Sequence, residues 1–200
     1  PVPFGVPILG GNTVGMVGGG FYDINSDQEP INDRDGQLIN LTIDYAFNDR
    51  WSLKSITSSQ SMDRFLRDDL DSTDANLFGQ NNYTEESDSF GQELILNYSA
   101  DQLDVLGGVM YFEEDLYGEV RVPLTNLCFL LAPAACGTPV GDFLNGGNYL
   151  QDGDVDIEAW GAYVEANYSI SDKWSVIAGL RYNYEERDGT GSFIFDAISL

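Results

Sequence analysis

Three stretches of the chain alternate hydrophobic and polar side chains with a period of two. They are QLINLTIDYAF at 37–47, VDIEAWGAYVEANYSI at 155–170 and WSVIAGLRYNYEE at 174–186. Three further stretches are strand candidates: WSLKSITSSQSMDRF at 51–65, SFGQELILNY at 89–98 and LDVLGGVMYF at 103–112. Alternation with this period predicts β-strands with one apolar and one polar face. No stretch favours a helix, so we expect an all-β fold with about six long strands.

The connections between these strands alternate in length. Those near 48–50, 100–102 and 171–173 are short, whereas 66–87 and 118–154 are long, acidic and rich in Gly, Asn and Asp. Short turns at one end and long loops at the other are typical of an outer-membrane barrel. We therefore expect an antiparallel meander of three hairpins over 37–187, forming an arc of a larger transmembrane β-barrel. Residues 1–36 are expected to form a glycine-rich loop segment, and 188–200 the start of a further outer loop or strand.

Aromatic residues lie beside each short turn, and a second set follows about ten residues further along the strands. Amphipathic rings prefer the membrane–water interface, and ten tilted residues span roughly 23 Å, close to the height of a barrel's lipid-facing band. The predicted girdle residues are Tyr45, Phe47, Trp51, Tyr98, Tyr168 and Trp174 near the turns, and Trp160 and Tyr182 at the far end. The motifs NDRWSL at 48–53 and SDKWSV at 171–176 are then two equivalent periplasmic turns. The alternative is a soluble β-sandwich with these tryptophans in its core.

The same alternation assigns side chains to the two faces of the sheet. We expect Tyr45, Trp51, Tyr168 and Trp174 to face lipid. We expect Asp44, Arg181, Asn183 and Glu185 to face the lumen.

The charge of the chain excludes several function classes. Lys and Arg number 9 against 33 Asp and Glu, which gives a net charge of −24, and there is no histidine. Such a surface repels nucleic-acid phosphates, so we expect no nucleic-acid partner. Without histidine, catalytic triads and ordinary zinc sites are excluded, and no carboxylate pair stands out for acid–base chemistry. We predict no enzymatic activity and no cofactor.

Two cysteines lie in the second long loop. Cys128 and Cys136, in LCFLLAPAACGTP, could close a nine-residue loop worth roughly 2.5 kcal/mol by chain-entropy reasoning. The alternative is a pair of unpaired thiols in a small apolar loop. We predict the disulfide, because the segment is flanked by Gly and Pro and lies between strands.

Two acidic motifs are weak candidates for a hard cation such as Ca²⁺. The first, DGDVDIE, contains Asp152, Asp154, Asp156 and Glu158, which a strand would place on one face. The second is RDDLDSTD at 67–74. Both lack the glycine and the distal glutamate of an EF-hand loop. The alternative for each is a solvated acidic loop.

Three long stretches resemble the β-barrel of TonB-dependent outer-membrane receptors. They are DINSDQEPINDRDGQLINLTIDYAFNDRWSLKSITSSQSMDRFLRDDLD, SFGQELILNYSADQLDVLGGVMYFEED and AWGAYVEANYSISDKWSVIAGLRYNYEERDG. The resemblance implies a 22-stranded barrel with an N-terminal plug in the bacterial outer membrane. It also implies import of a scarce nutrient, often a ferric chelate, energised by an inner-membrane complex. The expected partners are outer-membrane lipid, the rest of the barrel, the plug and a small nutrient ligand.

The sequence pattern alone is also compatible with a second class of function. The chain could be a β-rich surface protein with a structural or interaction role, whose acidic loops bind cations or other chains. Six strands are too few to close a transmembrane barrel. If these residues were the complete chain, we would expect copies to pair through strand edges into a homo-oligomer.

Overall fold

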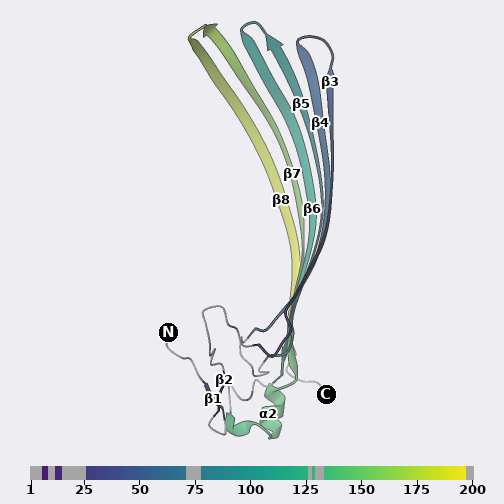
Figure 1. Cartoon of the computed structure of the whole chain (residues 1–200), viewed down its shortest axis with the longest axis vertical. Helices are drawn as coiled ribbons and strands as arrows, with labels where there is room; N and C mark the ends of the chain where they lie inside the picture. Colours follow the sequence, from purple (N-terminus) through teal and green to yellow (C-terminus); the bar gives the residue numbers. More distant parts are fainter. Residues whose placement is uncertain are drawn as a thin grey trace.

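The computed structural model describes residues 6–8, 12–14, 26–70, 78–125, 128 and 133–196. Most of them form one six-stranded antiparallel sheet in which each strand pairs with the next along the chain (Figure 1). Its strands are β3 (Ile31–Ala46), β4 (Trp51–Asp68), β5 (Asn81–Ala100), β6 (Leu103–Leu124), β7 (Gly147–Ser171) and β8 (Trp174–Asp196). This is the predicted meander, an open arc.

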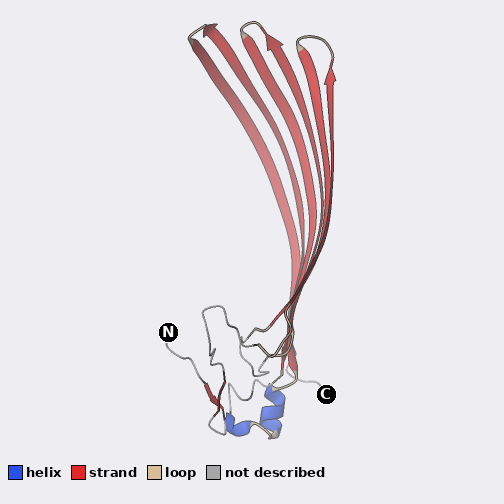
Figure 2. Ribbon diagram, in the orientation of Figure 1, coloured by secondary structure: helices blue, strands red, loops and turns tan. Residues whose placement is uncertain are grey.

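Smaller elements accompany the sheet. β1 (Val6–Ile8) pairs with β2 (Asn12–Val14), and the connection between β6 and β7 carries the 3-10 turn η1 (Pro133–Ala135) and the short helix α2 (Pro139–Leu144). Figure 2 shows the sheet curving upward to three tight turns, with the helices at the opposite end. No helix among the described residues is long and apolar enough to cross a membrane.

The strands are longer than the hydrophobic pattern predicted. β3 begins at Ile31 rather than 37, β4 continues to Asp68, β6 continues to Leu124 and β7 begins at Gly147. The first outer connection therefore spans 69–80 instead of 66–87, and the second spans 125–146 instead of 118–154. Residues 188–196 belong to β8. These extensions, such as INDRDG in β3, carry polar residues on both faces and so give no alternating signal.

Parts of the predicted loops lie outside the described residues. This applies to 1–5, 9–11 and 15–25 of the glycine-rich segment, to 71–77 and to most of 126–132, and to 197–200. The second half of RDDLDSTD, residues 71–74, falls within the 71–77 gap.

The repeated turn motif has a hydrogen-bonding explanation. The Asn48 side-chain oxygen accepts hydrogen bonds from the backbone N–H groups of Arg50 and Trp51, at 2.9 and 3.0 Å. In the second copy, the Ser171 hydroxyl accepts from the backbone N–H of Lys173 at 3.4 Å. Short polar side chains that bond their own backbone two residues on favour tight turns. The small polar residue that begins each motif thus closes the turn that leads into the tryptophan.

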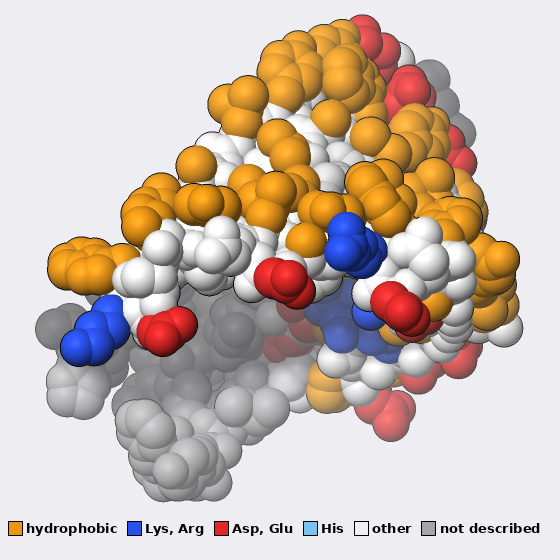
Figure 3. Space-filling view, turned by 90° about the horizontal axis from the view of Figure 1, so that it is seen from above, with side chains coloured by type: hydrophobic (Ala, Val, Ile, Leu, Met, Phe, Trp, Pro, Cys, Tyr) orange, Lys and Arg blue, Asp and Glu red, His pale blue; other side chains and the backbone are white. Residues whose placement is uncertain are grey.

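The register separates the side chains onto two faces. Trp51 pairs with Tyr98, and Tyr168 with Val176, so the aromatic positions beside the turns share one face. Arg181 pairs with Tyr163 on the other face. Seen along the strands from the turn end, hydrophobic side chains gather over one side of the arc (Figure 3).

The second face is the concave one. There the Tyr163 hydroxyl on β7 donates to Glu93 on β5 at 2.7 Å, reaching across β6. Arg181 on β8 likewise reaches Met110 on β6, across β7. Neighbouring strands lie about 4.8 Å apart, so side chains that meet across an intervening strand converge over a concave surface. Tyr163 marks the concave face and the aromatic face is convex.

The sheet has little core of its own. Among the described residues, the buried hydrophobic side chains are Val122, Leu124 and Cys128, all at the loop end. Along the arc, large apolar side chains on the convex face are exposed, for example Leu180 at 75 % and Trp174 at 72 %. An arc of this kind requires apolar surroundings on its convex side to cover these residues.

Candidate functional site

The concave face carries a polar cluster midway along the strands. Tyr163 donates its hydroxyl proton to Glu93, and the Arg181 guanidinium lies 5.6 Å from the centre of the Tyr163 ring. Arg181 also donates to the side-chain oxygen of Asn183 at 2.8 Å. Gly108 allows this arrangement, because a Cβ atom there would lie only 2.4 Å from the Tyr163 ring. Tyr163 therefore lies across a bare backbone, which fixes its hydroxyl toward β5.

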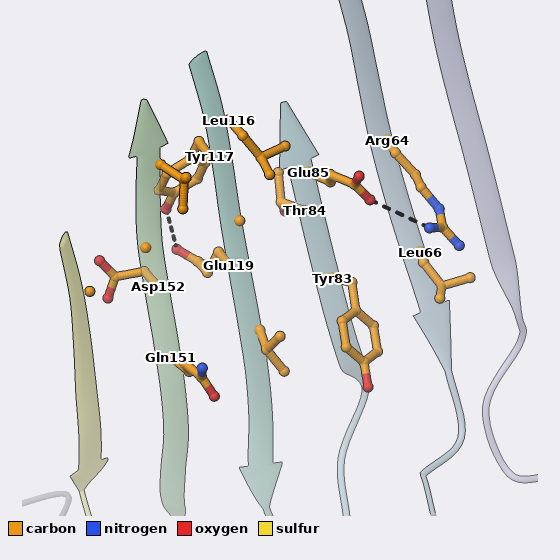
Figure 4. A pocket seen from close by; sticks show the side chains of 15 residues that line it. Arg64, Leu66, Tyr83, Thr84, Glu85, Leu116, Tyr117, Glu119, Gln151 and Asp152 are labelled. Carbon is orange, nitrogen blue, oxygen red and sulfur yellow. Dashed lines mark hydrogen bonds and ion pairs between the residues drawn. The ribbon is translucent and has the colours of Figure 1, made fainter. Parts of the chain in front are cut away.

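Nearer the long loops, the concave side of the sheet forms an open groove of about 600 Å³. It crosses β4 to β8, and most of its lining residues belong to the concave face. The apolar lining includes Leu66, Tyr83, Leu116, Val120 and Val155 (Figure 4). We call this surface the outer groove.

Three paired glycines form the floor of the outer groove. Gly118 on β6 is the register partner of Gly153 on β7, which in turn pairs with Gly191 on β8. All three line the groove. We call them the glycine row. They expose backbone over three adjacent strands, and two strand spacings of about 4.8 Å make this bare strip roughly 10 Å wide.

Charged side chains continue the same transverse row beyond the glycines. Gly118 pairs with Glu85 on β5, Glu85 pairs with Arg64 on β4, and Arg64 pairs with Arg34 on β3. Arg64 and Glu85 form an ion pair at 3.4 Å, drawn in Figure 4. The Arg64 Nε atom is buried and has no hydrogen-bond partner. One end of the row is therefore basic, with two guanidinium groups and a single carboxylate.

A tyrosine at the level of the outer groove has a perturbed hydroxyl. Burial, together with a hydrogen bond to Glu119 at 3.2 Å, raises the pKa of Tyr117 above its ordinary value. The Tyr117 hydroxyl is the donor in this hydrogen bond.

The second outer connection is tied to the strand ends. Cys128 and Cys136 are joined by a disulfide bond. The Asn145 side chain accepts from the Cys128 backbone N–H at 3.0 Å and donates to its sulfur at 3.2 Å. The backbone N–H of Gly146 donates to the Leu124 carbonyl at 2.7 Å, which closes the base of the loop. These bonds hold the segment close to the loop end of β6 and β7.

The aromatic residues expected to form girdles fall into two groups on the convex face. Near the turns, the rings of Trp51 and Tyr98 lie 4.7 Å apart, and those of Tyr45 and Phe47 lie 5.0 Å apart. At the far end, Trp160 contacts Tyr182 at 5.3 Å and Tyr184 at 5.8 Å. Tyr168 and Trp174 share the turn-side group by register. Whether these groups meet the two membrane interfaces stays a prediction.

The acidic cation candidates belong to the convex face by register, although Asp152 also lines the outer groove. Asp152, Asp154, Asp156 and Glu158 alternate along β7 on the convex face. Among the described residues, no group of three or more His, Cys, Asp or Glu side chains is placed to hold a metal ion.

The outer groove was not predicted from the sequence. Arg64, Glu85 and the glycine row carry no motif, because cross-strand pairing is not visible in any one strand. One signal was available: Gly118, Gly153 and Gly191 each lie seven residues from an aromatic residue further along the same strand, namely Tyr111, Trp160 and Tyr184. Since these aromatics are themselves paired in register, the constant spacing would have aligned the glycines.

Comparison with known proteins identifies relatives of this sheet. Residues 3–197 match the family model described as TonB dependent receptor-like, beta-barrel. The crystal structure of the ferric yersiniabactin uptake receptor FyuA from Yersinia pestis superposes with a TM-score of 0.61 at 14 % sequence identity. The match covers 84 % of this chain and 24 % of that receptor, so the chain spans about a quarter of its length. A search of curated proteins finds no match.

Proposed function

Because the chain belongs to the family of TonB-dependent receptor β-barrels, we propose that it forms part of the wall of a bacterial outer-membrane receptor that imports a scarce nutrient. The nutrient is a ferric chelate or a similar small ligand, and import is energised by an inner-membrane complex. The observation that carries the proposal is the family match over 3–197, on a sheet with an apolar convex face and a polar concave face.

Two observations support this role. The strands of the sheet have 16 to 25 residues, whereas about 9–11 tilted residues cross a bilayer. The strands therefore project beyond the far girdle and carry the outer groove away from the membrane core. The structural likeness to FyuA, a ferric yersiniabactin uptake receptor, supports a ferric chelate as the first ligand to test.

The partners follow from the same proposal. Lipid covers the convex face, further strands pair with β3 and β8, and a plug occupies the concave side. The ligand binds from the loop end. Catalysis is not part of the proposal, and no specific observation favours the cation-binding surface protein considered above.

Uptake measurements on the full-length receptor test this function. Cells that carry or lack the receptor are given a ferric chelate labelled with radioactive iron, with and without a protonophore. We expect receptor-dependent accumulation that stops with the protonophore, while surface binding persists. Equal accumulation in cells that lack the receptor contradicts import. Accumulation that is unchanged by the protonophore contradicts the energisation of import, but not import itself.

A further inference from the structure

The outer groove has a shape that the fold itself does not require. Gly118 lies in the middle of β6 without a positive φ, since the described positive-φ glycines are Gly137 and Gly146. A Cβ atom at Gly118 would meet nothing within 4 Å. Glycine in a strand interior is unfavourable, because it loses backbone entropy and packs no side chain. Neither backbone conformation nor packing explains the glycine at this position. The remaining explanation is the bare backbone surface that a glycine leaves in the groove.

The walls of the groove run parallel to the glycine row. Leu116 and Val155 lie two residues to one side of it on β6 and β7, and Val120 and Gln151 lie two residues to the other. Each wall is therefore roughly 6.8 Å from the row along the strands. The space between the walls is a shallow slot that runs across the strands over exposed peptide planes. A slot of this shape accommodates a flat body better than a bulky one.

The charged residues at the end of the slot favour a ligand with a negative charge. Arg34 and Arg64 are direct register partners, and like charges directly opposite each other are unfavourable. Glu85 offsets only one of them. On the concave face two guanidinium groups therefore accompany one carboxylate, whereas the carboxylates of Asp33, Asp35, Asp63 and Glu86 lie nearby on the convex face. The buried Arg64 Nε–H lacks an acceptor and lies in the groove lining.

We propose that the outer groove binds a flat, conjugated ligand with an anionic group, the ring lying on the glycine row and the anion contacting Arg64 and Arg34. This inference rests on the proposed function, because the groove is treated as the ligand-binding wall of the receptor. It goes further by assigning the ligand's shape, its charge and its orientation across the strands.

The test measures equilibrium binding to the full-length receptor in detergent with three ferric probes. The iron complex of 2,3-dihydroxybenzoate presents flat aromatic rings that each carry a free carboxylate, and the iron complex of catechol presents the same flat rings without it. These two are the flat probes, whereas ferric citrate has no ring. The variant Gly118→Val fills the slot at a position where an added Cβ atom meets nothing within 4 Å. Gly36→Val is the matched control, since Gly36 lies on the same face outside the groove and its added Cβ makes only an ordinary contact of 3.7 Å.

Gly118→Val is expected to weaken binding of both flat probes at least about tenfold, because the ring loses its contact surface, and to leave ferric citrate unchanged. Gly36→Val should stay within about twofold for all probes. Arg64→Gln should weaken binding of the dihydroxybenzoate complex by about tenfold or more and of the catechol complex by less, because one charge-assisted hydrogen bond to the ring carboxylate is lost.

Two outcomes separate the inference from the function on which it rests. If the unaltered receptor binds the probes but neither Gly118→Val nor Arg64→Gln changes binding of the dihydroxybenzoate complex, the inference is overturned and the receptor function stands. If the unaltered receptor binds none of the three, the proposed ferric-chelate function is overturned as well.

Discussion

At the scale of single residues, the two copies of the turn motif differ in the strength of their side-chain hydrogen bonds. Asn48 accepts two backbone N–H groups near 3.0 Å, whereas Ser171 accepts one at 3.4 Å. A typical intramolecular hydrogen bond contributes about 0.5–1.5 kcal/mol net. The asparagine copy is therefore the more strongly stabilised turn.

Replacing Asn48 by Ala should lower the free energy of unfolding of the full-length barrel in liposomes by about 1–2 kcal/mol, as measured by urea titration, because two hydrogen bonds are lost. Ser171→Ala should cost less than about 1 kcal/mol. Asn48→Asp keeps the acceptor oxygen and serves as the control. Equal losses for Asn48→Asp and Asn48→Ala would show that the side-chain oxygen does not stabilise the turn.

The disulfide gives a second prediction at this scale. Replacing Cys128 and Cys136 together by Ser should remove roughly 2.5 kcal/mol of loop stabilisation, because the nine-residue ring no longer restricts the open loop. Limited proteolysis should then cleave the 125–146 segment faster, while the strands remain resistant. Asn145→Ala, which removes the contacts of Asn145 with Cys128, should cause a smaller acceleration. Unchanged cleavage in the double Ser variant would contradict a restraining role.

At the scale of strands, a charged substitution should cost more stability on the convex face than on the concave face. Val164 lies on the convex face of β7 between the two girdles and is 47 % exposed. An arginine at the midplane of a lipid-facing strand costs about 2–4 kcal/mol. Val164→Arg should lower the free energy of unfolding by that amount in liposomes.

Leu106 provides the matched control for this prediction. It lies at the same level on β6, but it pairs with Glu165 on the concave face. Leu106→Arg introduces the same charge beside a carboxylate and away from lipid, so it should cost less than Val164→Arg. A larger loss for Leu106→Arg would place lipid on the concave side and reverse the assignment of faces.

The strands also show what the sequence can and cannot predict. Period-two alternation was sufficient to put Trp174 and Arg181 on opposite faces, because a strand has only two sides. The beginning of β3 at Ile31 was not predictable in this way, because neither face of INDRDG is apolar. The outer groove was missed for a different reason. Gly118, Gly153 and Gly191 become neighbours only through pairing, and pairing depends on three strands at once.

At the scale of the whole molecule, the arc leaves two strand edges and one apolar face uncovered. Within the described sheet, β3 and β8 each pair on one side only. In lipid, each unpaired backbone group costs several kcal/mol, because no water is present to satisfy it. In water, the exposed stripe that includes Trp174 and Leu180 favours association.

The 200 residues expressed alone should therefore not form a soluble, folded monomer. Additional barrel strands would satisfy both edges and lipid would cover the convex face, but an isolated arc in detergent-free buffer can bury them only against other copies. Sedimentation velocity should show large or heterogeneous species, and a membrane mimic should change their distribution. A monodisperse monomer that unfolds cooperatively would mean that the convex face packs against the chain itself. The soluble β-sandwich would then replace the barrel wall, with the tryptophans in its core.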